Sequence, residues 1–354
     1  MPKQWRAAVV GTGVVGGWHV GTIPLIPNCK LVAVCDAEPA KTRTALEKAK
    51  LTGIPEYTDL AEMLRRHPDI DVVHVCTPSG DHLGPATLAM NSGKHVICEK
   101  PLEIRLDRID QMIATARKND VRLAGIFQNR WNHANRALRD ASAEGRFGRL
   151  AWAGCFTPWY RPDQYYREGG WRGTWKYDGG GAVMNQSVHA IDLLQWIAGP
   201  VKSVSAYASS RIHPDIEVED TLSASLQFEN GAFGTIMGTT AMYPGSPVRI
   251  EVGGENGTAV SENGLKTFKF RDERPADKEL LASLAPKTGG TTGGGASNTD
   301  VSRELHLRNI QHILQCWEEG RDAETTGAEA RKAVAIVLAM YESARNGGNA
   351  VAVK

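Results

Sequence analysis

Short apolar runs separated by helical patterns occupy the first third of the chain. The runs are continuous and rich in β-branched residues, which is typical of strands covered on both faces of a sheet. Strands that alternate with helices predict βαβ units with right-handed crossovers, and hence an α/β fold with a doubly wound parallel sheet of Rossmann type. We expect this domain to span residues 1–128. The predicted strands are residues 7–10, 31–35, 72–76, 95–98 and 123–127, with helices at 40–50, 82–91 and 106–118.

The pattern changes after about residue 128. Alternation of apolar or small residues with polar ones, as in residues 222–228, predicts antiparallel strands. We expect residues 129–354 to form an α+β domain with a large, open, mostly antiparallel sheet that binds substrate and supports oligomerisation. Helical patterns lie at 182–196 and 304–346, and the Gly/Thr-rich residues 276–300 are expected to form a flexible loop. Hairpin turns are predicted at the Asn-Gly pairs 230–231, 256–257 and 263–264, because both residues tolerate positive φ.

Composition argues against several classes of function. The chain has 354 residues, too many for one ordinary domain, and a net charge of +1, which gives no general attraction to nucleic acid or an anionic membrane. No apolar stretch approaches the roughly 20 residues of a membrane span, and the first predicted strand begins too close to Met1 for a signal peptide. None of the six cysteines forms a Cys-x-x-Cys pair, so we expect no metal site. Free cysteines suit a reducing compartment, and we expect a cytoplasmic protein.

A glycine motif follows the first predicted strand and opens a predicted helix. This GxGxxG pattern, in that context, indicates a dinucleotide-binding turn. The first glycine permits the tight turn, the second lets the backbone approach a pyrophosphate, and the third lets the helix pack on the strand. The alternative is a glycine-rich turn without a ligand. The motif is Gly11, Thr12, Gly13, Val14, Val15 and Gly16.

Asp36 ends the second predicted strand, about 20 residues beyond the glycines, where NAD-binding domains place a carboxylate against the ribose. This carboxylate would accept a hydrogen bond from the 2′-hydroxyl and repel a 2′-phosphate, and Glu38 adds negative charge. We therefore predict NAD rather than NADP as the cofactor. Asp36 is also a candidate cap for the following helix, and the two roles are compatible.

Further motifs resemble a known family. Together with the glycine motif, they are similar to those of the Gfo/Idh/MocA oxidoreductases, named for glucose–fructose oxidoreductase and inositol dehydrogenase, and the resemblance runs through nearly the whole chain. They are Glu99-Lys100-Pro101 after the fifth strand, Gly179-Gly180-Gly181 followed by His189 and Asp192, Thr77-Pro78-Ser79 with His82, Val218-Glu219-Asp220, and Tyr341-Glu342-Ser343-Ala344.

The resemblance implies that Lys100 and His189 act on a substrate hydroxyl. The family often carries Asp where this chain has Asn185, and because an amide cannot take a proton, base function falls on the other two residues. Residues four apart share a face of an α-helix, so Asn185 and His189 are expected to meet one ligand. Histidine suits proton abstraction near neutral pH. Lys100, whose pKa burial and the nicotinium charge should lower, would relay a proton or stabilise the alkoxide.

The remaining candidate residues carry two interpretations each. Near the cofactor, the resemblance points to Thr77, Pro78 and His82, and it also suggests a cis peptide before Pro101. Further candidate cofactor-binding residues are Glu99, Lys100 and Gln128. Glu99 would contact the nicotinamide ribose or else be a surface charge at a strand end, and Gln128 would line the cleft or pack between domains. Aromatic faces suit sugar C–H groups, and Arg172 would hold hydroxyls or an acidic group; the same side chains would otherwise serve an intersubunit contact. The candidate substrate residues are Lys100, Arg130, Trp171, Arg172, Trp175, Asn185 and His189.

The expected function is that of an NAD-dependent dehydrogenase which oxidises a secondary ring hydroxyl, with C3 as a candidate, of a sugar, glycoside, sugar derivative or cyclitol. An NAD-using glycosidase and a non-catalytic NAD or sugar sensor are the alternatives. The sensor has no chemical need for Lys100 and His189, which argues against it. We expect a small-molecule, sugar-like partner and a homodimer or homotetramer.

Overall fold

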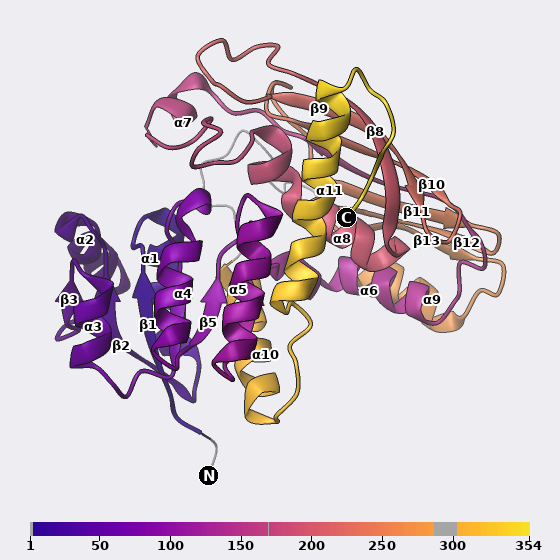
Figure 1. Cartoon of the computed structure of the whole chain (residues 1–354). Coiled ribbons are helices and arrows are strands. Elements are labelled where there is room, and N and C mark those ends of the chain that lie inside the picture. The colour runs from indigo at the N-terminus through magenta and orange to yellow at the C-terminus, as the bar shows by residue number, and fades with distance from the viewer. Residues whose placement is uncertain (1–2, 169, 287–302) are drawn as a thin grey trace. The chain divides into compact units, whose positions relative to one another are not determined.

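The computed structural model describes residues 3–168, 170–286 and 303–354 (Figure 1). The chain divides into two compact units. The first comprises Met1–Gln128 and Val301–Arg331, and the second comprises Asn129–Asp300 and Lys332–Lys354. The first unit thus ends at residue 128 in its main part, and residues 301–331 return to it.

The first unit contains a six-stranded sheet in the order β3-β2-β1-β4-β5-β6, in which every neighbouring pair is parallel. This confirms the Rossmann-type fold. Strand order reverses beside β1, so the chain segments that follow β1 and β4 flank the switch point where such sheets bind ligands. The strands are β1 (Trp5–Val10), β2 (Cys29–Cys35), β3 (Glu56–Tyr57), β4 (Val72–Val75), β5 (His95–Cys98) and β6 (Leu123–Gly125). The helices are α1 (Val14–Thr22), η1 (Ile23–Leu25), α2 (Pro39–Ala49), α3 (Leu60–Arg66), η2 (Ser79–Asp81), α4 (Leu83–Asn91) and α5 (Leu106–Lys118).

Helix α10 (Arg303–Glu318) belongs to the core of the first unit. Its apolar residues Ile310 and Ile313 are fully buried in the same cluster as Val9 of β1, and Trp317 lies 6.1 Å from the ring of Trp5. The expectation that residues 129–354 form a single domain is therefore wrong for 301–331. Helical periodicity shows that a helix has a buried face, but it does not show which core buries that face.

The second unit contains an eight-stranded sheet in the order β13-β12-β11-β7-β10-β9-β8-β14. Its pairs are antiparallel except for β7 with β10, which confirms a mostly antiparallel sheet. Helices α8, α6 and the π-helical turn η4 pack against it. The strands are β7 (Leu150–Pro158), β8 (Val201–Ser209), β9 (Thr221–Phe228), β10 (Phe233–Thr239), β11 (Arg249–Gly254), β12 (Gly257–Glu262), β13 (Leu265–Phe270) and β14 (Val351–Ala352). The helices are η3 (Gln128–Trp131), α6 (His133–Ala143), α7 (Asp163–Arg167), η4 (Ala182–Ser187), α8 (Val188–Ala198), α9 (Pro275–Ser283) and α11 (Gly327–Arg345), which contains the 331/332 boundary.

Local predictions in the second unit had mixed outcomes. Each Asn-Gly pair connects two antiparallel strands as predicted, and at Asn263 and Gly264 both φ angles are positive. The flexible loop predicted for 276–300 is wrong at its start, where α9 forms; residues 287–302 lie outside the described residues. Pro275 begins α9, and Asp277 stabilises this end by accepting hydrogen bonds from the backbone of Arg274 and from Arg146.

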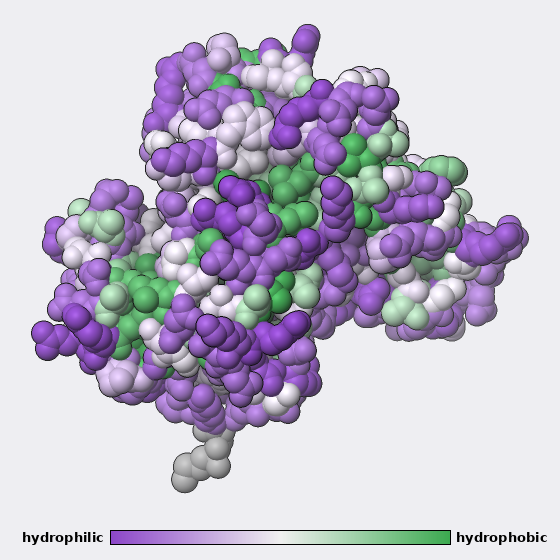
Figure 2. All heavy atoms as spheres, in the orientation of Figure 1, coloured by the Kyte–Doolittle hydropathy of each residue, from purple (hydrophilic) through white to green (hydrophobic). Residues whose placement is uncertain are grey.

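The visible face of the molecule is mostly hydrophilic, with smaller areas where hydrophobic side chains gather (Figure 2). Within the described residues, no helix is both long enough and apolar enough to cross a membrane.

Candidate functional site

The turn between β1 and α1 is built on glycine for steric reasons. Gly11 has a φ of +81°, and a Cβ there would lie 2.6 Å from the backbone of Cys76. A Cβ on Gly16 would lie 1.8 Å from the Gly11 carbonyl oxygen. Both contacts are impossible for a larger residue, so these two glycines let the turn, α1 and the end of β4 approach one another.

Gly13 differs from the other two glycines because nothing lies within 4 Å of the position its Cβ would take. It is also the N-cap of α1 and provides no side-chain cap, so no N-cap side chain accepts a hydrogen bond from the first amides of the helix. Thr12 is buried beside this turn, whereas Val14 is half exposed. A helix N-terminus without a side-chain cap, preceded by a glycine whose backbone a ligand can approach closely, fits the pyrophosphate of a dinucleotide.

Asp36, directly after β2, is tied to the glycine turn. Its carboxylate accepts hydrogen bonds from the Thr12 amide at 2.7 Å, the Thr12 hydroxyl at 3.2 Å and the Glu38 amide at 3.0 Å. The cap of α2 is Glu38, so the alternative that Asp36 caps this helix is wrong. A carboxylate has about four acceptor sites, so one remains for a ribose hydroxyl.

Glu99 lies at the centre of a buried cluster of histidines. Its Oε1 lies 2.9 Å from Nε2 of His19 and 3.4 Å from Nε2 of His306, and Nδ1 of His19 lies 2.8 Å from Nδ1 of His74. Burial alone would raise the pKa of Glu99, but the hydrogen bonds from His19 and His306 hold this pKa well below its usual value. Only 6% of Glu99 is exposed, so the surface-charge alternative is wrong, and its contact with the nicotinamide ribose stays a prediction.

The same three groups have the spacing of possible metal ligands. One ligand atom from each of His19, Glu99 and His306 lies within 4.8 Å of the others. The 2.9 Å separation of His19 and Glu99 is that of a direct hydrogen bond, whereas two ligands of a tetrahedral zinc ion stand roughly 3.3 Å apart. No motif indicated this cluster, because its members are distant in the chain, and the expected absence of a metal stays a prediction.

Lys100 follows Glu99 and precedes a cis peptide at Pro101, as the family resemblance suggested. Its backbone amide donates to Oε2 of Glu99 at 3.1 Å. His82 fixes the same region, because Nδ1 lies 3.0 Å from the Pro101 carbonyl oxygen and Nε2 lies 2.9 Å from that of Thr77. Since His82 is 1% exposed and both nitrogens face backbone oxygens, its effect on a cofactor is indirect. Thr77, Pro78 and Lys100 keep part of their surface exposed, and Gln128 is buried.

In the second unit, Asn185 and His189 lie on either side of a change in helix type. Asn185 is in the π-helical turn η4, in which the Ser187 hydroxyl donates to the Ala182 carbonyl at 2.9 Å, and His189 is in the first turn of α8. The same-face argument assumed a regular α-helix, so it does not describe this pair. Asn185 donates to Asp178 at 2.6 Å, and His189 is partly exposed among buried neighbours. Single-turn π-helices are frequent at functional sites.

Glu219 anchors the start of this turn. Its carboxylate accepts hydrogen bonds from the amides of Gly181 at 3.0 Å and Val183 at 2.9 Å, and from the Tyr341 hydroxyl at 2.9 Å. A Cβ on Gly181 would meet the Glu219 carbonyl oxygen at 1.8 Å, and one on Gly180 would meet the Tyr341 hydroxyl at 2.0 Å. The glycine run therefore lets two distant segments close over the beginning of η4.

Arg130 is not a substrate contact. It is 1% exposed and forms a bidentate ion pair with Asp192 of α8, with Nε at 2.7 Å and Nη2 at 2.5 Å, while its guanidinium stacks on Trp196. This correction has a simple cause: a buried arginine needs a carboxylate, and Asp192 is provided by a helix more than 60 residues away.

The aromatic segment before the glycine run contains residues that sequence reasoning missed. Arg161 donates to Oε1 of Gln186 at 3.0 Å, and Gln186 donates to the Tyr165 hydroxyl at 2.8 Å. The guanidinium of Arg172 lies 4.4 Å from the Tyr165 ring centroid and 5.6 Å from that of Trp171. Arg172 and Asn185 therefore join one cluster through Tyr165 and Gln186. The density of Arg and Tyr in this segment was the only available signal.

Trp175 lies elsewhere in the second unit. It is 42% exposed, packs edge-on to Tyr341 at 5.4 Å, and lines a cavity of about 260 Å³ with Glu219 and Arg345. Trp175 therefore contacts the residues around the Glu219 anchor.

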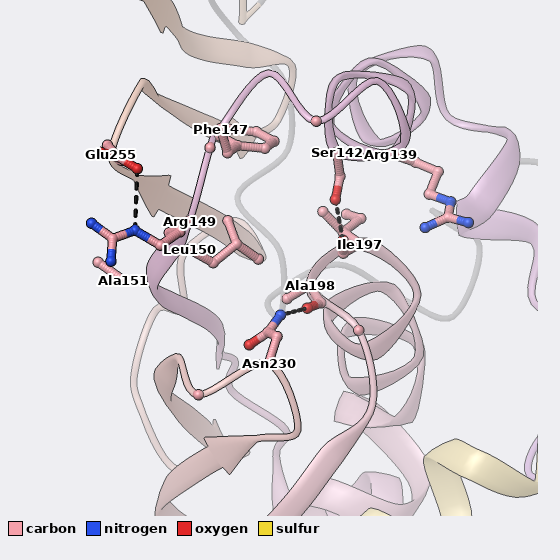
Figure 3. A pocket seen from close by; sticks show the side chains of 14 residues that line it. Arg139, Ser142, Phe147, Arg149, Leu150, Ala151, Ile197, Ala198, Asn230 and Glu255 are labelled. Atoms are coloured by element: carbon pink, nitrogen blue, oxygen red, sulfur yellow. Dashed lines mark hydrogen bonds and ion pairs between the residues drawn. The ribbon is translucent and has the colours of Figure 1, made fainter.

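A larger cavity, of about 710 Å³, lies at the other end of α8 from His189 (Figure 3). The side chains of Arg139, Ser142 and Asn230 donate to the carbonyl groups of residues 196–198 at 2.6–2.9 Å. These polar groups satisfy the C-terminus of α8, so they do not indicate a ligand.

Lys100 belongs to the first unit and His189 to the second. Their convergence on one alcohol stays a prediction.

Comparison with known proteins gives consistent matches. Residues 5–127 match the oxidoreductase family with an NAD-binding Rossmann fold, and residues 135–260 match the Gfo/Idh/MocA C-terminal domain. The chain is similar to the WlbA dehydrogenase of Bordetella pertussis, solved in complex with NADH and UDP-GlcNAcA, with 31% identity, a TM-score of 0.87, and coverage of 99% of both chains.

Two curated relatives are also similar. Myo-inositol 2-dehydrogenase of Thermotoga maritima is 28% identical over 280 residues, covering 77% of this chain and 80% of the relative. D-apiose dehydrogenase of Paraburkholderia graminis is 26% identical over 357 residues, covering 98% and 89%. With both domain models matched over most of its length, this chain is an NAD-dependent oxidoreductase and belongs to the Gfo/Idh/MocA family.

Proposed function

We propose that this protein oxidises a secondary ring hydroxyl of a sugar, sugar derivative or cyclitol. The observation that carries the proposal is the partly exposed His189 in the first turn of α8, with Asn185 in the preceding turn bonded into a polar, aromatic cluster. Such a cluster suits a hydroxylated ring, because aromatic faces pack on C–H groups and polar side chains bind hydroxyls. The sugar and cyclitol substrates of the relatives support the same class.

In this mechanism the alcohol gives its hydroxyl proton to a protein side chain and its carbon-bound hydride to the cofactor. His189 takes the hydroxyl proton, for which an imidazole is suited near neutral pH. The Lys100 ammonium stabilises the developing alkoxide. The Gly13 backbone and the amides at the start of α1 would hold the NAD pyrophosphate and Asp36 its ribose; NAD, when bound, would supply the hydride acceptor. Asn185 orients the ring hydroxyl through its amide and takes no proton.

The test is turnover of purified protein with NAD and a panel of sugars, cyclitols and nucleotide sugars, followed by NADH absorbance. Lys100→Ala and His189→Ala should each abolish turnover and leave NAD affinity nearly unchanged, because neither residue holds the dinucleotide phosphates. Normal rates in both variants would refute the mechanism. Release of a leaving group without net NADH would indicate the glycosidase alternative instead.

The uncovered face of the eight-stranded sheet supports self-association as a homodimer or homotetramer. Tyr207 and Phe233 are 71% and 63% exposed, and Trp152 stacks on Phe156 with the guanidinium of Arg249 above it. Exposed aromatic residues on one face are typical of an interface. Light scattering should give the mass of an oligomer for the wild type and a smaller mass for Phe233→Asp.

The six free cysteines suit a reducing compartment, and we propose the cytoplasm.

A further inference from the structure

Two guanidinium groups lie against the ring of Tyr165 in the second unit. The Arg172 group is 4.4 Å and the Arg161 group 5.2 Å from the ring centroid. Arg161 lies three residues beyond the end of β7, whereas Arg172 comes from the loop beyond α7. Two like charges around one aromatic ring repel each other, and a bound anion would relieve this repulsion.

The scaffold around Arg161 is fixed through its backbone. Its amide donates to the Thr240 carbonyl at 2.8 Å, and its carbonyl oxygen lies 2.7 Å from Nε2 of His213. The neighbouring Tyr166 hydroxyl lies 2.8 Å from the hydroxyl of Thr240. The Arg161 side chain therefore starts from a defined point and does not depend on a mobile loop for its position.

The acceptors close to these cations are already used within the protein. Oε1 of Gln186 accepts from Arg161, and the two oxygens of Asp178 accept from Asn185 at 2.6 Å and from the Gly173 amide at 2.9 Å. Among the described residues, Arg172 has only the Tyr165 carbonyl oxygen, at 3.3 Å, as a hydrogen-bond acceptor, and no carboxylate pairs with it. The Arg172 guanidinium thus keeps donors for a ligand, and its charge is not neutralised by a carboxylate within the described part of the chain.

This arrangement disfavours the charged form of Arg161. Burial lowers the pKa of Arg161, and the charge of Arg172 lowers it further, although the adjacent tyrosines oppose this. A bound anion would reverse the effect of the like charge. A guanidinium binds a carboxylate through two parallel N–H···O bonds, which gives strength and orientation together.

We infer that Arg161 and Arg172 form a subsite for a carboxylate on the substrate, so that the alcohol oxidised here is a sugar acid. This inference rests on the proposed function, since it names the class of substrate for the same site. Arg172 holds the carboxylate, and Arg161 adds positive charge from the segment that follows β7. The connection through Gln186 to Asn185 places the acid group on the side of the substrate ring nearest η4.

The test uses the full-length protein saturated with NAD and ligands that differ only at one carbon: D-glucuronate, D-glucose and D-glucose 6-phosphate, and, as nucleotide sugars, UDP-glucuronate and UDP-glucose. We expect the acid of a pair to have a kcat/KM or an affinity at least about 10-fold above its neutral partner. Arg172→Met should reduce this preference by roughly 10- to 100-fold, as expected for loss of a charge-assisted hydrogen bond.

The matched control is Arg167→Met. Arg167 is an exposed arginine of α7 that pairs with Asp215 at 3.0 Å, so its loss should leave the preference intact. Because Arg161→Met could fail to fold, Arg161→Lys is used in its place. It keeps the charge but not the planar guanidinium, and it should weaken binding of the acid about 10-fold. Thermal melting of each variant confirms folding.

The outcomes separate this inference from the proposed function. Equal use of acid and neutral sugars, or an acid preference that survives Arg172→Met, overturns the subsite while the dehydrogenase proposal stands. A preference for the 6-phosphate over the acid overturns the carboxylate assignment. Binding of the acid that depends on Arg172, without NADH formation, supports the subsite and overturns the proposed function. Absence of both binding and turnover for every acid overturns the subsite.

Discussion

Replacement of Glu219 by glutamine should change how the stability of the protein depends on pH. Glu219 is 4% exposed, and burial raises its pKa from 4.5 to about 7, against the opposing effect of the Val183 amide, the Tyr341 hydroxyl and the Gly181 amide. The folded protein therefore binds this proton more tightly than the unfolded chain does. Its contribution to stability is full below about pH 4.5 and is lost as the pH rises through about 7.

The magnitude follows from the shift. At 1.36 kcal/mol per unit, a rise from 4.5 to about 7 corresponds to about 3 kcal/mol, of which about 2.5 kcal/mol is lost between pH 5 and pH 8. Glutamine does not titrate, so Glu219→Gln removes this slope. The free energy of unfolding of the wild type minus that of the variant should fall by about 2.5 kcal/mol over this range.

Urea titrations followed by tryptophan fluorescence, at matched ionic strength and at several pH values, measure this difference. Glu217→Gln is the control, because Glu217 is exposed in the same turn and should keep the wild-type slope. Tyr341→Phe removes a hydrogen bond that favours the carboxylate, so the midpoint of the stability loss should move to a higher pH. Identical slopes for the wild type and Glu219→Gln would refute the assignment of this proton to Glu219.

Other substitutions separate the fold from the binding of NAD. Gly16→Ala should prevent stable folding of the first unit even without NAD, because its Cβ would overlap the turn, whereas Gly13→Ala should keep the melting temperature and weaken NAD binding. Calorimetry of the apo proteins and an NAD titration distinguish the two. Asp36→Ala should weaken NAD binding and reduce the preference for NAD over NADP. An unchanged ratio of the two dissociation constants would show that Asp36 does not contact the ribose. Arg130→Met should lower the free energy of unfolding by about 3–5 kcal/mol, because it removes the bidentate ion pair of the buried Asp192 carboxylate; a loss below about 1 kcal/mol in a denaturant titration would contradict that role.

The cofactor half of the protein could be predicted because its determinants are local in sequence. The glycine turn, the strand before it and Asp36 lie within one βαβ unit, so spacing alone indicates their arrangement. The interpretation of Arg130 failed for the opposite reason. Its position just after the last parallel strand is compatible with a cleft, and only the partner on α8 shows that the side chain is buried. For the same reason, the helical pattern of α10 did not reveal that it completes the first core.

The glycine run before η4 shows how much of the candidate site depends on such distant contacts. From sequence, Gly180 and Gly181 are only the opening of a helix. In the structure they are small because the Glu219 carbonyl and the Tyr341 hydroxyl occupy the space that side chains would need. The Glu219 carboxylate, which also accepts from the Tyr341 hydroxyl, binds the amides of Gly181 and Val183 at the start of η4. The turn η4 carries Asn185 and leads into the turn with His189. The geometry of these residues is therefore set by the segment before β9 and by the C-terminal helix α11, which do not themselves bear the proposed chemistry. A substitution at Glu219 or Tyr341 should accordingly alter kcat more than NAD affinity.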